Sequence, residues 1–372
     1  LLYILVKKIF EKIGPNSKYI GLIAAFLLTF NYKHVVNSHI GLPDIYNSFF
    51  LLLSLFSSIN LWKNPRLRNY ILAGIAAGLS FSVKYQIFAL FPLLLTHLYL
   101  SFNNKRFSLD KLLNFKIFIC LALIPLVFAL TNPYFFIHFD QALKAVRDVS
   151  QKYGMGTNKL NLYPIWYMYN VDYGLPTLLA ITLGVLLAVK KFFKQSLLLL
   201  SVVVPFIYVF FYYSIGGFYV RNIITITPIF FIFAAFFFWL IIEKLARLLN
   251  KNVALFLMFV ILLLAVYLPG KNSIINSYYY TKGWGYDALK AWVSSNFQNE
   301  FIVAAHPFDF SKGILKNKRT EFEIDGAFAL NEHKENEAEY ALINLDWGGN
   351  PFYFWMNFGP QDLKKYWNKP YE

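Results

Sequence analysis

The sequence predicts an α-helical polytopic membrane protein with a small C-terminal α/β domain, and three observations lead to this fold class. The chain of 372 residues is 58% hydrophobic and only 15% charged, with a mean hydropathy of +0.46, which is too apolar for a soluble domain of this length. Several long windows contain no Lys, Arg, Asp or Glu, and after Gly270 the composition becomes mixed and charged. We therefore expect a transmembrane domain over residues 1–270 and a globular domain over residues 271–372.

Uncharged windows that are long enough to cross the hydrocarbon core define the expected spans. A helical span needs roughly 20 apolar residues, and somewhat fewer in short spans. Such windows cover residues 45–62, 85–104, 117–137, 173–189, 195–220, 222–242 and 252–270. Weaker candidates cover residues 19–36 and 69–83, and Leu1–Val6 is interpreted as the end of a further span. We expect about nine or ten crossings, in a chain that starts without Met and is truncated at its N-terminus.

The net charge of +15 is explained by membrane topology rather than by nucleic-acid binding. Of the 35 Lys and Arg residues, 17 occupy every second connection between expected spans and only seven occupy the intervening connections. Under the positive-inside rule the basic connections face the cytoplasm. Beyond residue 270 there are 11 cations and 13 anions, so the positive excess belongs to the membrane part. A nucleic-acid partner is therefore not expected.

Residues 69–104 are interpreted as a hairpin of two short helices. Both flanks are basic, so an even number of crossings is required, and Lys84 is the charged residue that interrupts the apolar run. The turn at Lys84 and Tyr85 is expected on the outer side. The long outer loop covers residues 138–172, where apolar residues at helical spacing within Phe139–Tyr153 predict an amphipathic helix on the membrane surface.

The same charge pattern places the C-terminal domain on the outer, extracytoplasmic side, because a basic connection precedes the last span. Within this domain Tyr286–Phe297 is expected to form a helix, and Phe301–Ala305 and Ala341–Leu345 are expected to form strands. Alternating helix and strand patterns of this kind favour an α/β domain.

Ionisable residues at the outer ends of the spans are the candidate functional groups, because charges at membrane depth are costly and tend to be functional. Asp44 starts an uncharged span, although a carboxylate there is also a common helix cap. Lys84 and Arg221 are isolated outer cations, which suit a bound phosphate but also suit snorkelling to lipid headgroups. His39 is a weaker candidate for hydrogen bonding to a sugar or phosphate, since lone histidines near an interface are more often structural.

Known cofactor and hydrolase motifs are absent from the sequence. It contains no H-E-x-x-H, P-loop or G-x-G-x-x-G pattern, so zinc hydrolysis, ATP hydrolysis and dinucleotide chemistry are not indicated. The single cysteine, Cys120, lies inside an expected span and excludes an intrachain disulfide. No metal ligand is assigned.

The order of several short motifs resembles a known family. The motifs are Ser38–Asp44 followed by Phe49–Leu52, Ala73–Ser80, Ser82–Tyr85, Pro92, Arg221–Pro228, and Gly283–Gly285 with Ala288 and Trp292. Together they resemble the polyprenyl-phosphate-sugar-dependent glycosyltransferases of the C superfamily. That group includes the dolichyl-phosphate-mannose protein mannosyltransferases and the aminoarabinose transferases that act on lipid A.

The resemblance implies a membrane glycosyltransferase with an outward-facing site. An acceptor hydroxyl would attack the anomeric carbon of a polyprenyl-phosphate sugar with inversion, and cations would stabilise the departing lipid phosphate. Lys84 and Arg221 fit that role, His39 and Tyr85 are assigned as further substrate contacts, and Asp44 is assigned as an active-site carboxylate. The family's main catalytic Asp lies in an outer loop that is expected to precede this chain.

The resemblance leaves several points open. The sugar is a hexose or a pentose, the acceptor is a protein, a glycolipid or a polysaccharide, and the participation of a divalent metal is undecided. The alternative functions are a transporter or flippase of a lipid-linked anion and a non-catalytic membrane scaffold. The absence of a visible internal repeat argues weakly against a transporter.

Overall fold

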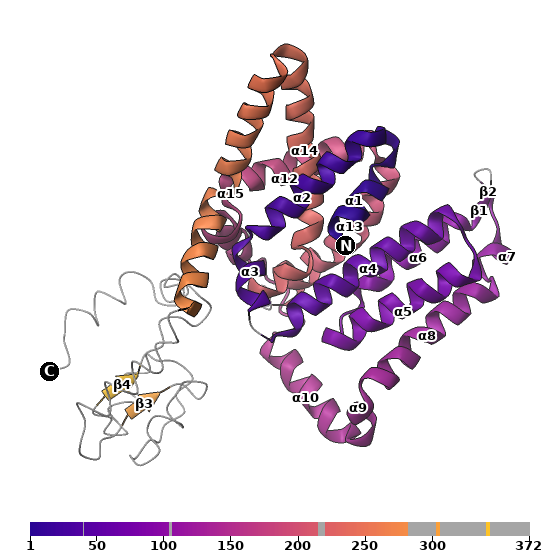
Figure 1. Ribbon diagram of the computed structural model, residues 1–372. Helices are drawn as coiled ribbons and strands as arrows, with labels where there is room; N and C mark the ends of the chain where they lie inside the picture. Colours follow the sequence, from indigo (N-terminus) through magenta and orange to yellow (C-terminus); the bar gives the residue numbers. More distant parts are fainter. Residues whose placement is uncertain (40, 104–105, 215–219, 282–302, 306–339, 343–372) are drawn as a thin grey trace. The chain divides into compact units, whose positions relative to one another are not determined.

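The computed structural model describes residues 1–39, 41–103, 106–214, 220–281, 303–305 and 340–342 (Figure 1). The chain divides into two compact units, residues 1–277 and residues 278–372, which are described separately. The first unit is built from helices. The prediction of an α-helical polytopic membrane protein is confirmed, because six described helices are long and apolar enough to cross a membrane.

The helices follow one another with short connections. Their bounds are α1 Leu2–Ile9, α2 Ser17–Thr29, α3 Tyr32–Ser38, α4 Pro43–Lys63, α5 Leu67–Lys84, α6 Leu90–Leu100, α7 Leu109–Leu112, α8 Phe115–Thr131, α9 Pro133–Ile137, α10 Phe139–Lys152, α11 Tyr163–Tyr167, α12 Gly174–Lys191, α13 Phe193–Tyr208, α14 Thr227–Leu248 and α15 Lys251–Thr281. Shorter helical segments are η1 Glu11–Asn16, η2 Ile87–Ala89, η3 Met168–Asp172, η4 Val209–Tyr213 and η6 Val220–Thr225. Two antiparallel strands of two residues each, β1 Phe102–Asn103 and β2 Arg106–Phe107, follow α6.

The number of membrane crossings differs between the sequence analysis and the helix lengths. Six helices pass a length and hydropathy test, and the α2–α3 pair, bent by 66°, gives a seventh if it is one broken span. The remaining expected crossings fall on α1, which has eight residues, on α5, which carries charges, and on the short apolar stretch Ile87–Leu100. The figure of nine or ten crossings therefore stays a prediction that depends on these shorter elements.

Helix α5 packs between α4 and α8. Two glycines on α5 allow its backbone to lie close to that of α8. A Cβ atom at Gly74 would lie 2.5 Å from the carbonyl oxygen of Cys120, and one at Gly78 would lie 2.8 Å from Cβ of Val127. Two glycines four residues apart on one helix face let two backbones meet, as in other membrane helix pairs. This contact holds the C-terminal end of α5 in place.

Helix α14 forms the centre of the largest hydrophobic cluster. Every residue from Thr227 to Phe236 is buried, so this stretch is enclosed on all sides rather than on a single face. Helices α2 and α12 pack directly on it. The segment η6, which precedes α14, also contacts α3 and α4 and thereby brings the connection before α14 next to the start of α4.

Two predicted local features are confirmed. The apolar run of residues 69–104 breaks at Lys84, where α5 ends and Tyr85 adopts a left-handed conformation with φ of 56°. The expected amphipathic helix of the long loop corresponds to α10, in which no residue is buried.

In the second unit the structure describes two short strands. Strand β3, Val303–Ala305, pairs in parallel with β4, Tyr340–Leu342, with Val303 opposite Tyr340. Both strands fall on or overlap the positions predicted from the sequence, and their parallel pairing is typical of α/β folds. The helix expected over Tyr286–Phe297 lies outside the described residues.

Candidate active site

A buried ion pair joins the start of α4 to the end of α5. The ammonium nitrogen of Lys84 donates a hydrogen bond of 2.6 Å to Oδ1 of Asp44. The Asp44 side chain is only 2% exposed and the Lys84 side chain 12% exposed. A buried charge is costly without a partner, so removing either side chain would leave the other buried and uncompensated.

The helix ends themselves favour this placement of charge. Asp44 lies in the first turn of α4, which begins with Pro43, and a carboxylate there interacts favourably with the positive end of the helix dipole. Lys84 is the last residue of α5, where a cation interacts favourably with the negative end of the dipole of that helix. The antiparallel packing of α4 and α5 brings the two complementary helix ends together.

Asn222 completes the cluster from a third element. Its Oδ1 accepts a hydrogen bond of 2.9 Å from Lys84, and its side chain also interacts with the hydroxyl of Tyr153 at the end of α10. Arg221 precedes Asn222 in η6 and is exposed. The consecutive helices α4 and α5 and the distant segment η6 thus place Lys84 and Arg221 at the same end of the helix bundle.

A layer of neutral side chains supports the ion pair. Asn47, one turn after Asp44, donates to Oε1 of Gln86 at 2.9 Å and to the hydroxyl of Thr225 at 3.3 Å. The hydroxyl of Ser80, one turn before Lys84, donates to Oδ1 of Asn47 at 3.0 Å. These bonds tie α4, α5 and η6 to one another, so the position of the Lys84 ammonium is set by the surrounding structure.

The other two residues proposed from the sequence have different surroundings. The ring of Tyr85 is exposed and contacts the rings of Phe81, Phe128 and Phe135. His39 is exposed at the end of α3, and its Nδ1 lies 2.8 Å from the carbonyl oxygen of Val35 in its own helix. The substrate roles of both residues stay predictions.

Asn222, Asn47 and Tyr153 were not proposed from the sequence. Neutral polar side chains produce no charge signal in a hydropathy profile, so they do not stand out in an apolar chain. One signal was available for Asn47, because it follows Asp44 by three residues and so lies on the same helix face. Asn222 had only its position next to Arg221.

A second buried polar cluster lies between α3 and η3. Oδ1 of Asp172 accepts hydrogen bonds of 2.8 Å from the side chain of Asn31 and 2.8 Å from the backbone N–H of Lys33. The Lys33 ammonium lies 5.3 Å from the ring centroid of Tyr167. Burial raises the pKa of the Asp172 carboxyl to about 6, against the opposing effect of the backbone N–H and the charge of Lys33.

The described residues do not fit a divalent metal ion. No group of three or more His, Cys, Asp or Glu side chains within the described part of the chain is arranged as a ligand set. Oδ1 of the Asp44 carboxylate is engaged by the Lys84 ammonium group.

Comparison with known proteins agrees with the resemblance found in the sequence. Residues 1–133 match the family model of dolichyl-phosphate-mannose-protein mannosyltransferase. This stretch contains Asp44 and Lys84, and the match confirms the resemblance over these residues. Among curated proteins no match to the chain is found.

Two solved structures of an oligosaccharyltransferase from Archaeoglobus fulgidus are also similar. One, in complex with zinc and sulfate, shows 15% identity and a TM-score of 0.42, covering 80% of this chain and 42% of that chain. The other, named AglB and in complex with an inhibitory peptide and a dolichol-phosphate, shows 13% identity and a TM-score of 0.44, covering 84% of this chain and 50% of that chain. The chain therefore spans half or less of the length of these proteins.

Proposed function

We propose that the protein is an integral-membrane glycosyltransferase that moves a sugar from a polyprenyl-phosphate donor to an acceptor hydroxyl on the extracytoplasmic side. The observation that carries this proposal is the cluster of Asp44, Lys84 and Asn222 with Arg221 beside it. The match of residues 1–133 to a lipid-phosphate-sugar-dependent family supports it.

The cluster suits the stabilisation of a departing phosphate. In the described part of the chain, Lys84 uses two of its three N–H donors, on Asp44 and Asn222, and one remains for a phosphate oxygen. A donor that is held in place before the reaction stabilises developing negative charge without reorganising. Asp44 and Asn222 act as positioning residues for the Lys84 ammonium.

Arg221 supplies the net positive charge of the site. The charge of Lys84 is balanced by Asp44, whereas the guanidinium of Arg221 is exposed at the same end of the bundle. A guanidinium binds phosphate through two parallel N–H donors, which fixes the orientation of the phosphate as well as its position. The two cations would thus hold a lipid phosphate between η6 and the α4–α5 pair.

Orientation and domain organisation are part of the proposal. The Asp44 end of the bundle would face the extracytoplasmic side, with a transmembrane domain over residues 1–270 and an extracytoplasmic α/β domain over residues 271–372, and the distribution of basic connections supports this orientation. The sugar, hexose or pentose, and the acceptor, a protein, a glycolipid or a polysaccharide, are left open. The family match does not favour the transporter or flippase alternative.

Transfer of radiolabelled sugar from a polyprenyl-phosphate donor by the full-length protein in liposomes tests this function. We expect turnover by the unchanged protein and a reduction of roughly 100-fold or more in Arg221→Ala, since removing one donor to a developing oxyanion has that order of effect. Arg147→Ala, on the exposed face of α10, is the matched control and should retain activity. Full turnover in Arg221→Ala would overturn the assignment of this site.

A further inference from the structure

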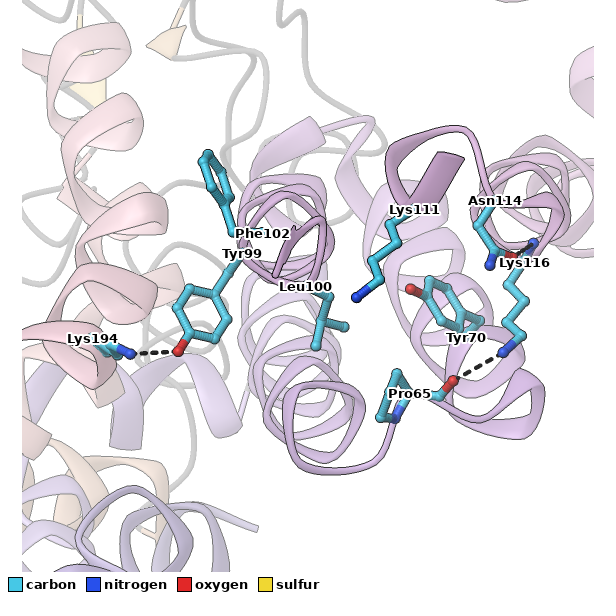
Figure 2. A pocket seen from close by; sticks show the side chains of 9 residues that line it. All are labelled: Pro65, Tyr70, Tyr99, Leu100, Phe102, Lys111, Asn114, Lys116 and Lys194. Atoms are coloured by element: carbon cyan, nitrogen blue, oxygen red, sulfur yellow. Dashed lines mark hydrogen bonds between the residues drawn. The ribbon is translucent and has the colours of Figure 1, made fainter. Parts of the chain in front are cut away.

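A second feature of the first unit is a cavity of about 890 Å³, whose lining side chains are shown in Figure 2. It lies at the end of the bundle opposite to the Asp44–Lys84 pair. Its wall includes Pro65, in the connection between the end of α4 and the start of α5. Asp44 and Lys84 lie at the other ends of these two helices, and at 1.5 Å per residue roughly 30 Å of helix separates them from the cavity. The cavity is therefore distinct from the candidate active site.

Three lysines, two tyrosines and one asparagine line this cavity. Its described lining residues are Pro65, Tyr70, Tyr99, Leu100, Phe102, Lys111, Asn114, Lys116 and Lys194. No acidic residue is among them. The elements that contribute lysines are α7, α8 and α13, so the positive charge is assembled by the tertiary fold.

The three lysines have no carboxylate partner in the described part of the chain. Lys116 donates to the carbonyl oxygen of Pro65 at 3.3 Å and Lys194 donates to the hydroxyl of Tyr99, and both acceptors are neutral. Lys111 makes no hydrogen bond or ion pair with the described residues, and its side chain points into the cavity between Tyr70 and Leu100 (Figure 2). Such a site has an electrostatic preference for an anion.

The cavity also has an apolar side. Tyr99 and Phe102 are partly exposed, and Tyr99 packs edge-on against Trp62. The neighbouring segments carry the exposed apolar side chains of Leu113 and Phe115. Aromatic and apolar groups beside lysines are typical of the membrane–water interface, where a ligand has a charged end and a hydrocarbon end.

We propose that this cavity binds the phosphate-bearing headgroup of an anionic phospholipid. It lies at the end of the bundle that carries the basic connections, which the positive-inside rule assigns to the cytoplasmic leaflet. Anionic lipids of that leaflet bind basic pockets between transmembrane helices. Lys111 and Lys116 contact the phosphate, Lys194 and Tyr99 form the opposite wall, and the acyl chains extend along the exposed apolar side chains.

Native mass spectrometry of the full-length protein, titrated with phosphatidylglycerol or phosphatidylcholine, tests the proposal. We expect preferential binding of phosphatidylglycerol, weakened roughly 30-fold in the double variant Lys111→Gln with Lys116→Gln, which corresponds to about a fivefold loss for each lysine. The matched control is Lys12→Gln with Lys244→Gln, which removes the same charge from exposed positions outside the cavity. The control should bind phosphatidylglycerol like the unchanged protein.

Two outcomes would overturn the proposal. Equal phosphatidylglycerol binding by the double variant and the control would show that the cavity lysines do not select the lipid. Displacement of the lipid by an equal concentration of soluble glycerol 3-phosphate would show that the site recognises free phosphate and gains nothing from its apolar wall. Sugar transfer by the double variant, measured separately, distinguishes loss of this site from failure of the proposed function.

Discussion

Lys84 and Asp44 form an ion pair of 2.6 Å that is almost entirely enclosed by protein, at the point where α5 ends and α4 begins. Asn222 accepts a second hydrogen bond from the same ammonium group. The pair therefore has two roles that experiments can separate. It stabilises the packing of α4 against α5, and it positions a donor for the proposed lipid phosphate.

Because the two charges compensate each other, removing one of them should cost much more stability than removing both. Lys84→Ala leaves the buried Asp44 carboxylate without its cation, and we expect a loss of about 3–5 kcal/mol in stability. The double variant Asp44→Asn with Lys84→Met removes both charges and should be closer to the unchanged protein. Thermal unfolding in detergent measures both effects. A double variant that is less stable than Lys84→Ala would contradict this account.

Substitution of Arg221 should change the rate of sugar transfer by the protein rather than its free energy of unfolding. The side chain is exposed, so Arg221→Lys is expected to change the free energy of unfolding by less than about 0.5 kcal/mol. A lysine keeps the charge but not the two parallel donors, so sugar transfer should fall to a level between those of the unchanged protein and Arg221→Ala. Equal turnover in the Lys and Ala variants would show that the charge contributes nothing.

Gly74 is expected to be intolerant of any side chain. A Cβ atom there would lie 2.5 Å from the backbone oxygen of Cys120, so Gly74→Ala must push α5 away from α8. We expect a loss of about 1–3 kcal/mol, as for other overpacked contacts. Gly41→Ala is the control, because a Cβ atom at Gly41 has no neighbour within 4 Å. Similar unfolding temperatures for the two variants would refute the close contact.

Asp172 should make stability depend on pH. Its pKa is raised from 3.8 to about 6 by burial, so the folded protein binds this proton more tightly than the unfolded chain does. The resulting stabilisation is fully present below about pH 4 and is lost as pH rises through about 6, on the order of 3 kcal/mol in total. Asp172→Asn keeps the acceptor oxygen and should remove this part of the pH dependence.

Apparent unfolding temperatures at pH 4 and pH 6.5 measure the Asp172 effect. Asp140→Asn, at an exposed position in α10, is the control and should retain the pH dependence of the unchanged protein. The difference between the two variants isolates Asp172 from all other titrating groups. An identical pH dependence in both would mean that the buried carboxyl does not titrate in this range.

Much of the helical architecture could be predicted from the sequence because hydropathy is a local property. The long apolar spans that became α4, α8 and α12 to α14 were expected close to their observed positions, whereas α15 runs to Thr281, beyond the expected end at residue 270. The break at Lys84 followed from the even number of crossings that the basic flanks of residues 69–104 require. The short helices α1 and α6 were harder to interpret, since a stretch of 8 to 11 residues does not decide by itself whether it crosses a membrane.

The candidate site could be predicted only in its charged members. Asp44, Lys84 and Arg221 stood out because ionisable groups are rare in an apolar chain, whereas Asn222, Asn47 and Tyr153 are neutral and gave no comparable signal. The sequence also did not indicate the cavity near Lys111, because its lysines were already explained as topological charges. Their convergence depends on the packing of α7, α8 and α13.

By itself, the sequence determined that this is a helical membrane protein and which isolated charges deserved attention, since both follow from the chemistry of consecutive residues. Only the tertiary structure decided that Lys84 pairs with Asp44, 40 residues away, and shares its ammonium with Asn222, 138 residues away. The physical reason is that these distances are set by helix packing. A glycine face on α5 and the enclosed helix α14 bring the ends of distant segments together, and no local pattern encodes that result.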